Sequence, residues 1–108
     1  MTNNPWQECI NACQRCATAC DFCAASCLQE NPEHMADCIR TDIDCAEICR
    51  TAAVFMARQS EHAKKICALC AEICQQCGDE CRKHDADHCQ ACARACDECA
   101  EQCRRMAA

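Results

Sequence analysis

Cysteine is the residue type in this chain with the most chemistry to offer. The chain has 108 residues, of which 19 are Cys, and thiolates serve as nucleophiles, redox groups and ligands for soft metal ions. Most of the cysteines recur in steps of alternately three and four residues, which is the spacing of one face of a helix that packs in a bundle. The four series are Cys9, Cys13, Cys16, Cys20, Cys23 and Cys27; the sparser Cys38, Cys45 and Cys49; Cys67, Cys70, Cys74, Cys77 and Cys81; and Cys89, Cys92, Cys96, Cys99 and Cys103.

This spacing argues against a disulfide scaffold. Neighbours three or four apart on a helix have Cβ atoms about 5–6 Å apart, whereas a disulfide needs about 3.5–4.5 Å. The cysteine number is odd, and one Gly and two Pro are too few for the loops of such scaffolds. The chain opens without the pattern of a signal peptide, so we expect a cytoplasmic protein whose cysteines are free thiols or metal thiolates.

Four helices must position these thiols, and the sequence indicates where each helix begins. Asn4-Pro5 and Asn31-Pro32 are typical helix starts, and Ser60 and Asp85 or Asp87 can cap the third and fourth helices. The predicted helices cover residues 5–29, 32–58, 61–84 and 86–106. Connections this short make consecutive helices antiparallel. We therefore predict an all-α fold, an antiparallel up-down-up-down four-helix bundle with a cysteine-lined core, formed as a single domain by residues 1–108.

Extending each cysteine series along its helix predicts what lies at the two ends. His34, Met35, His84 and His88 gather at one end as possible metal ligands at a mouth of the bundle, and His84 lies on the cysteine face itself. Trp6, Met56, His62 and Met106 gather at the other end, where a hydrophobic plug is expected. Asp42 interrupts the cysteine face of the second helix, where it could hydrogen-bond to a thiol or face a gap.

Composition excludes several classes of function. Apolar residues make up 51% of the chain, yet much of that share is Cys, and Phe, Trp and Tyr together reach only 3%. Leu or Ile would stabilise a core better than thiols do, so an inert cysteine core is a poor explanation. A net charge of −6 disfavours nucleic acid, no apolar run is long enough to span a membrane, and no Gly-rich phosphate loop or G-x-S-x-G motif suggests an enzyme.

Soft thiolates leave several metals open. Iron–sulfur clusters use closely spaced loop cysteines, which this chain lacks. Zn(II) or Cd(II) could occupy four-thiolate sites, but each site would bring a formal charge of about −2 into a dry core. Cu(I) adds no charge, because each pair of one cuprous ion and one thiolate is neutral. A thiol redox protein is a third reading, and Cys89 beside His88 would be its reactive residue.

The chain resembles the copper storage proteins, in particular their cytosolic branch. The resemblance rests on the CxxxCxxCxxxCxxCxxxC run from Cys9 to Cys27, the two CxxCxxxCxxCxxxC runs and the sparser set on the second helix. It implies that many Cu(I) ions are stored along the thiolate-lined core, loaded through one end with His and Met nearby. It also implies homotetramers of bundles in the bacterial cytosol. We place the open end at His34, His84 and His88. Ile39, Ile48, Phe55, Ile66 and Ile73 are candidates for an assembly surface or for packing inside the bundle.

Overall fold

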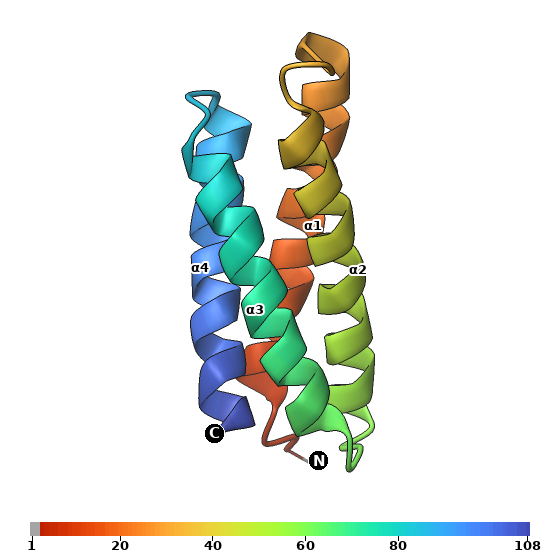
Figure 1. Cartoon of the computed structure of the whole chain (residues 1–108). Helices are drawn as coiled ribbons and strands as arrows, with labels where there is room; N and C mark the ends of the chain where they lie inside the picture. Colours follow the sequence, from red (N-terminus) through yellow and green to blue (C-terminus); the bar gives the residue numbers. More distant parts are fainter. Residues whose placement is uncertain (1–2) are drawn as a thin grey trace.

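Four antiparallel helices form the bundle (Figure 1). The computed structural model describes residues 3–108, and no strand occurs among them. The helices are α1 (Gln7–Glu30), α2 (Ala36–Ala57), α3 (Ala63–Arg82) and α4 (Asp87–Ala107). Helix α1 lies beside α2 and α4, and α3 lies beside the same two. The predicted all-α four-helix bundle is confirmed, and no helix of the described chain is long and apolar enough to cross a bilayer.

The two ends of the bundle are built differently. The α1–α2 and α3–α4 connections lie at one end, at the top of Figure 1, and we call it the histidine end because His34, His84 and His88 belong to these connections or their flanks. The α2–α3 connection and both chain termini lie at the other end, which we call the far end. A row of side chains along the bundle axis therefore meets different residues at its two ends.

Small residues let the helices approach closely around the cysteines. Alanines such as Ala46, Ala52 and Ala100 are fully buried beside the cysteine faces. A Cβ added at Gly78 on α3 would lie 3.1 Å from an Asp97 carboxylate oxygen and 3.3 Å from the Cys96 Cβ on α4. The close packing of α3 on α4 thus depends on a missing side chain. Short side chains bring the sulfurs of neighbouring helices within reach of each other.

Helix α2 begins at Ala36, four residues later than predicted. Residues 32–35 instead form a turn in which the Met35 N–H donates to the Asn31 carbonyl (3.0 Å) and the His34 N–H donates to the Asn31 side chain (3.4 Å). Pro32 has no N–H, and Asn31 closes this turn with its own side chain. His34 and Met35 therefore lie in the connection at the histidine end rather than inside a helix.

The far end is closed by local hydrogen bonds. The Asn4 side chain accepts from the Trp6 N–H (2.8 Å) and donates to the Met56 carbonyl (3.2 Å), which ties the start of α1 to the end of α2. Gln59 follows α2 with a φ of 52°, and the Ser60 N–H donates back to the Phe55 carbonyl (3.0 Å), as in a Schellman C-cap.

Neither α3 nor α4 begins with the predicted side-chain cap. The Ser60 side chain accepts from the His62 N–H (3.1 Å) in the turn ahead of α3, but the N-cap of α3 is His62 and has no side-chain hydrogen bond, so Ser60 does not cap this helix. Helix α4 has Ala86 at its N-cap without a side-chain hydrogen bond, so neither Asp85 nor Asp87 caps it. Gln90 holds this connection instead, because its amide donates to the His84 carbonyl (2.7 Å).

Candidate metal centre

The cysteines form one continuous column of thiols inside the bundle. All 19 are free and buried, with at most 1% of any residue exposed. Sulfur–sulfur contacts of 3.5 to 4.0 Å connect the far end to the histidine end without a break. The path runs through Cys9, Cys103, Cys13, Cys99, Cys49, Cys74, Cys45, Cys16, Cys96, Cys20, Cys77, Cys81, Cys38, Cys23, Cys89 and Cys27.

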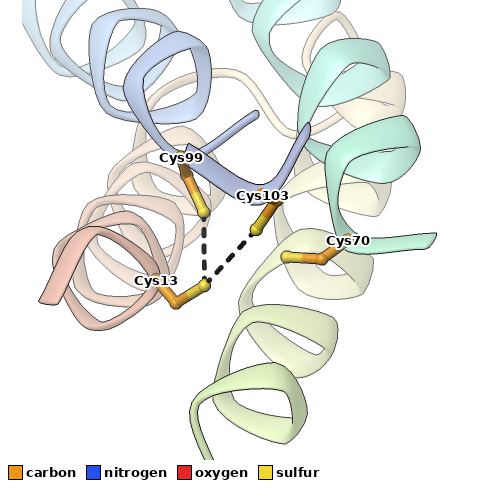
Figure 2. A group of neighbouring side chains, drawn as sticks. All are labelled: Cys13, Cys70, Cys99 and Cys103. Atoms are coloured by element: carbon orange, nitrogen blue, oxygen red, sulfur yellow. Dashed lines mark hydrogen bonds between the residues drawn. The ribbon is translucent and has the colours of Figure 1, made fainter. Parts of the chain in front are cut away.

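Within the column, sulfurs from different helices converge in groups of four. Figure 2 shows one group, in which the Cys13 sulfur lies 3.5 Å from that of Cys99 and 3.7 Å from that of Cys103, with Cys70 alongside. In each such group the ligand atoms all lie within 4.8 Å of one another. Other groups are Cys16, Cys49, Cys74 and Cys99; Cys16, Cys20, Cys45 and Cys96; Cys20, Cys77, Cys92 and Cys96; and Cys23, Cys27, Cys38 and Cys89.

Several of these groups share a cysteine with another group. Cys16, Cys20, Cys96 and Cys99 each belong to two of them, so the groups overlap and do not behave as isolated sites. Metal–sulfur bonds of about 2.3 Å would separate tetrahedral sulfurs by about 3.8 Å, so a divalent ion also fits one group. Sharing favours ions that accept bridging thiolates, because one sulfur then serves two ions.

Asp42 is the one buried charged or polar residue of the described chain, with no exposed surface. Its Oδ1 atom accepts from three thiols, Cys77 (3.2 Å), Cys92 (3.3 Å) and Cys81 (3.5 Å). Burial raises the pKa of this carboxyl far above its usual range, which favours its neutral form in the folded protein. Asp42 thus bonds to thiols, and of the two roles expected for it, facing a gap is excluded.

His88 is the imidazole that reaches the column. Its Nδ1 lies 3.5 Å from the Cys23 sulfur, 3.6 Å from that of Cys89 and 4.0 Å from that of Cys27. The opposite ring nitrogen lies 2.9 Å from a carboxylate oxygen of Glu30. Burial lowers the pKa of His88, but the hydrogen bonds with Cys23 and Glu30 outweigh it, so the net shift is upward. The carboxylate orients the ring so that its other nitrogen faces the sulfurs.

The other candidates at the histidine end take different positions. The rings of His34 and His84 meet edge to face, with centroids 5.8 Å apart. The Nε2 atom of His84 lies 2.9 Å from the Glu80 carboxylate, so its position on the cysteine face does not direct this nitrogen at a thiol. Met35 is buried against the core. The structure therefore gathers the expected residues at one end but makes His88, not His84, the residue in contact with sulfur.

Sequence reasoning missed the two carboxylates that hold these histidines. Glu80 lies in the last turn of α3 and His84 follows four residues later in the connection, and that spacing could have indicated their pairing. Glu30 and His88 come from different helices, so nothing local in the sequence points to their contact. Of the two carboxylates, that of Glu30 leaves the other ring nitrogen of its histidine facing the sulfurs.

Cys89 lacks the features of a reactive redox thiol. Burial raises the pKa of Cys27 to about 12, and burial also raises the pKa of Cys89. A redox thiol needs an exposed cysteine with a lowered pKa, whereas Cys89 has no exposed surface. The geometry suits ions that displace thiol protons inside the core better than it suits thiol exchange with a protein substrate.

Known proteins share this arrangement. A family described as "Copper storage protein" matches residues 2–108. Copper storage protein 3 from Bacillus subtilis has a solved apo structure that is 56% identical, with a TM-score of 0.91 over 94% of this chain and 98% of that one. A Cu(I)-bound structure of the B. subtilis protein is 55% identical, with a TM-score of 0.91 over 94% of this chain and 97% of that one.

A more distant relative has the same fold. The copper storage protein of Streptomyces lividans, loaded with 10 copper equivalents, is 38% identical with a TM-score of 0.90 over 94% of this chain and 83% of that one. An uncharacterised cysteine-rich protein of B. subtilis, YhjQ, is 55% identical over 83 residues, which are 76% of this chain and 77% of the relative. The match to the whole cysteine-bearing bundle, at this identity, shows that the chain belongs to the copper storage protein family.

Proposed function

We propose that this protein stores Cu(I), binding many cuprous ions through thiolates of its cysteines inside the bundle. The observation that carries the proposal is the unbroken column of thiols, because a chain of overlapping sulfur groups can hold a stack of bridged ions. Each Cu(I) that binds a thiolate releases one proton, so the stack adds no net charge to a core sealed from water. Relatives with Cu(I)-bound structures support the choice of metal.

All 19 cysteines are proposed as copper ligands, and copper is the cargo rather than a resident cofactor. His34, Met35, His84 and His88 are proposed as weaker ligands at the end through which copper enters. His88 is the best placed of them, because its ring nitrogen faces three sulfurs while its side chain is 10% exposed. An ion held by imidazole can pass to a thiolate less than 4 Å away.

A cytoplasmic location and a role without catalysis belong to the same proposal. A relative from S. lividans is a cytosolic copper storage protein, and the reduced state of the thiols needs a reducing compartment. We also propose that the chain assembles with copies of itself, as a homotetramer of bundles. Residues 1–108 act as a single domain, because the thiol column spans all four helices.

A Zn(II) or Cd(II) thiolate buffer is the second candidate, since each four-sulfur group also fits a tetrahedral divalent ion. The net charge of the loaded core distinguishes this buffer from a Cu(I) store, because every divalent four-thiolate site would bury about two negative charges. Competition tests this directly. We expect Cu(I) to expel Zn(II) or Co(II) completely from the reduced protein, with loss of the thiolate-to-Co(II) absorption. Retention of four-thiolate Co(II) sites in the presence of excess Cu(I) would favour the buffer.

A further inference from the structure

Helix α2 carries a second regular face that points away from the core. Arg40, Ile43, Glu47, Arg50, Val54 and Ala57 follow each other in steps of three, four, three, four and three, and all six are exposed. We call them the outer stripe. This spacing is that of a helix packing against another helix, yet α1 and α3 already occupy the other sides of α2.

The outer stripe exposes two β-branched side chains among its charged residues. Ile43 is 57% exposed and Val54 is 48% exposed. In contrast, all four isoleucines that the sequence offered as an assembly surface, Ile39, Ile48, Ile66 and Ile73, pack against the core. Ile43 and Val54 lie on either side of the central charged pair, so one opposing helix could cover both.

Hollows flank both apolar residues. A hollow of about 350 Å³ between the end of α1 and α2 is lined by Leu28, Ile39 and Ile43 among others, and Leu28 is itself 56% exposed. A second hollow of about 290 Å³ is lined by Glu47, Arg50, Thr51, Val54 and Phe55. Each hollow offers space for a side chain that projects from an opposing helix.

The charges along the stripe complement those of a second copy only when the two α2 helices run antiparallel. A parallel copy would set Glu47 against Glu47 and Arg50 against Arg50, which repel. An antiparallel copy, with the two-fold axis between Glu47 and Arg50, sets Glu47 of each chain against Arg50 of the other. The same register sets Ile43 of each chain against Val54 of the other, and Arg40 against the small Ala57.

We propose that the outer stripe of α2 is an interaction surface for a second copy of this chain, with the two α2 helices packed antiparallel about a two-fold axis. Such an interface is closed, because each surface element meets its complement on the partner. Arg50 already lies 2.7 Å from Asp21 on α1 and 3.7 Å from Glu47, so it is held near the position where the second Glu47 would meet it. This inference rests on the proposed self-association and names its surface.

The charge pairs allow a test in which two defects repair each other. Glu47→Arg gives a chain with Arg at both central positions, and Arg50→Glu gives a chain with Glu at both. Each variant alone faces two like-charge contacts across the two-fold axis, which should weaken α2 pairing at least about a hundredfold. A one-to-one mixture restores both contacts, so sedimentation velocity should show the paired species only in the mixture.

Apolar variants and a matched control complete the design. Ile43→Lys with Val54→Lys should lower the wild-type mass to half or less, while Leu69→Lys, at an exposed position on α3 (44% exposed), should leave it unchanged. Thermal unfolding and the number of Cu(I) ions per chain are measured for every variant. Unchanged copper numbers with altered mass support the stripe, and variants that keep the full wild-type mass overturn it.

Two other results also overturn the proposal. A wild-type chain that stays monomeric at micromolar concentration has no such interface, whatever its copper number. A mixture of the two charge variants that stays unpaired, beside a paired wild type, excludes the antiparallel register. Failure to bind copper would instead contradict the storage function while leaving the mass measurements to decide on the stripe.

Discussion

The thiol column ends in two different ways, and the difference indicates where ions are exchanged. At the histidine end, the last sulfurs contact an imidazole whose other nitrogen is held by a carboxylate at the surface. At the far end, Met56 and Ala63 have no exposed surface, and Asn4 ties α1 to α2. The histidine end offers polar, exchangeable ligands, whereas the far end is closed by buried side chains. We therefore expect copper ions to enter and leave at the histidine end alone.

Removing the plug should have the largest effect on stability. Met56→Ala deletes a fully buried side chain, and such changes cost about 2–5 kcal/mol because a cavity remains. Urea unfolding of the reduced apo protein measures this cost. The rate at which copper loads should stay unchanged, and a large acceleration would mean that copper can enter through the far end.

Asp42 lies between the two ends and should destabilise the apo protein at neutral pH. Its pKa is raised on folding, so folding favours the protonated acid, and its contribution is intact below the unfolded pKa of 3.8 and is lost as pH rises. One pKa unit corresponds to about 1.4 kcal/mol. We expect Asp42→Asn to be more stable than wild type by about 2 kcal/mol at pH 7.

The pH dependence provides the control for this prediction. The stability difference between Asp42→Asn and wild type should shrink toward zero as the pH falls below about 3, because the wild-type acid is then protonated in both states. Asp44→Asn, at an exposed position on the same helix, should show no such trend. A difference that is constant with pH would mean that Asp42 is ionised in the folded apo protein.

Histidines at the two ends should differ in their effect on copper loading. His88→Ala removes the imidazole that faces Cys23 and Cys89, and we expect loading from a Cu(I)–chelator donor to slow about tenfold. His62→Ala removes an imidazole at the far end and serves as the matched control. Stopped-flow absorbance measures both rates, and equal rates for the two variants would contradict the assignment of the histidine end.

A smaller effect on stability is expected from a substitution of Gln59 in the α2–α3 connection. Gln59 adopts a left-handed backbone conformation that costs a residue with a Cβ about 1 kcal/mol. Gln59→Gly should therefore raise the free energy of unfolding by about 1 kcal/mol without changing copper loading. Chemical denaturation of the apo protein checks the first point, and a change in loading rate would link this closed end to exchange.

The parts of the molecule that repeat were predictable from the sequence, and the unique contacts were not. The alternation of three and four residues between cysteines determines which helix face is inside, so the column and its bundle follow from spacing alone. The start of α2 was misplaced because Asn31 can either cap a helix or close a separate turn, and only the turn with His34 decides between them.

The choice between histidines depended on contacts between distant segments. His84 lies in line with the cysteines of α3, but Glu80 engages its Nε2 nitrogen. His88 lies off the line of α4, yet its ring meets sulfurs of α1 and a carboxylate at the end of α1. The local spacing can indicate the pair of Glu80 and His84, but it cannot reveal the contacts of His88, because these depend on how two helices are rotated against each other.

The most direct test of the account is the number of Cu(I) ions bound per chain. Reduced apo protein is titrated anaerobically with Cu(I) against a chromophoric Cu(I) chelator, and free thiols are counted in parallel. A continuous column of bridged thiolates predicts a count in the high teens, about one ion per cysteine, with loss of nearly all thiol reactivity. A count of about four or fewer would contradict it and indicate separate four-thiolate sites.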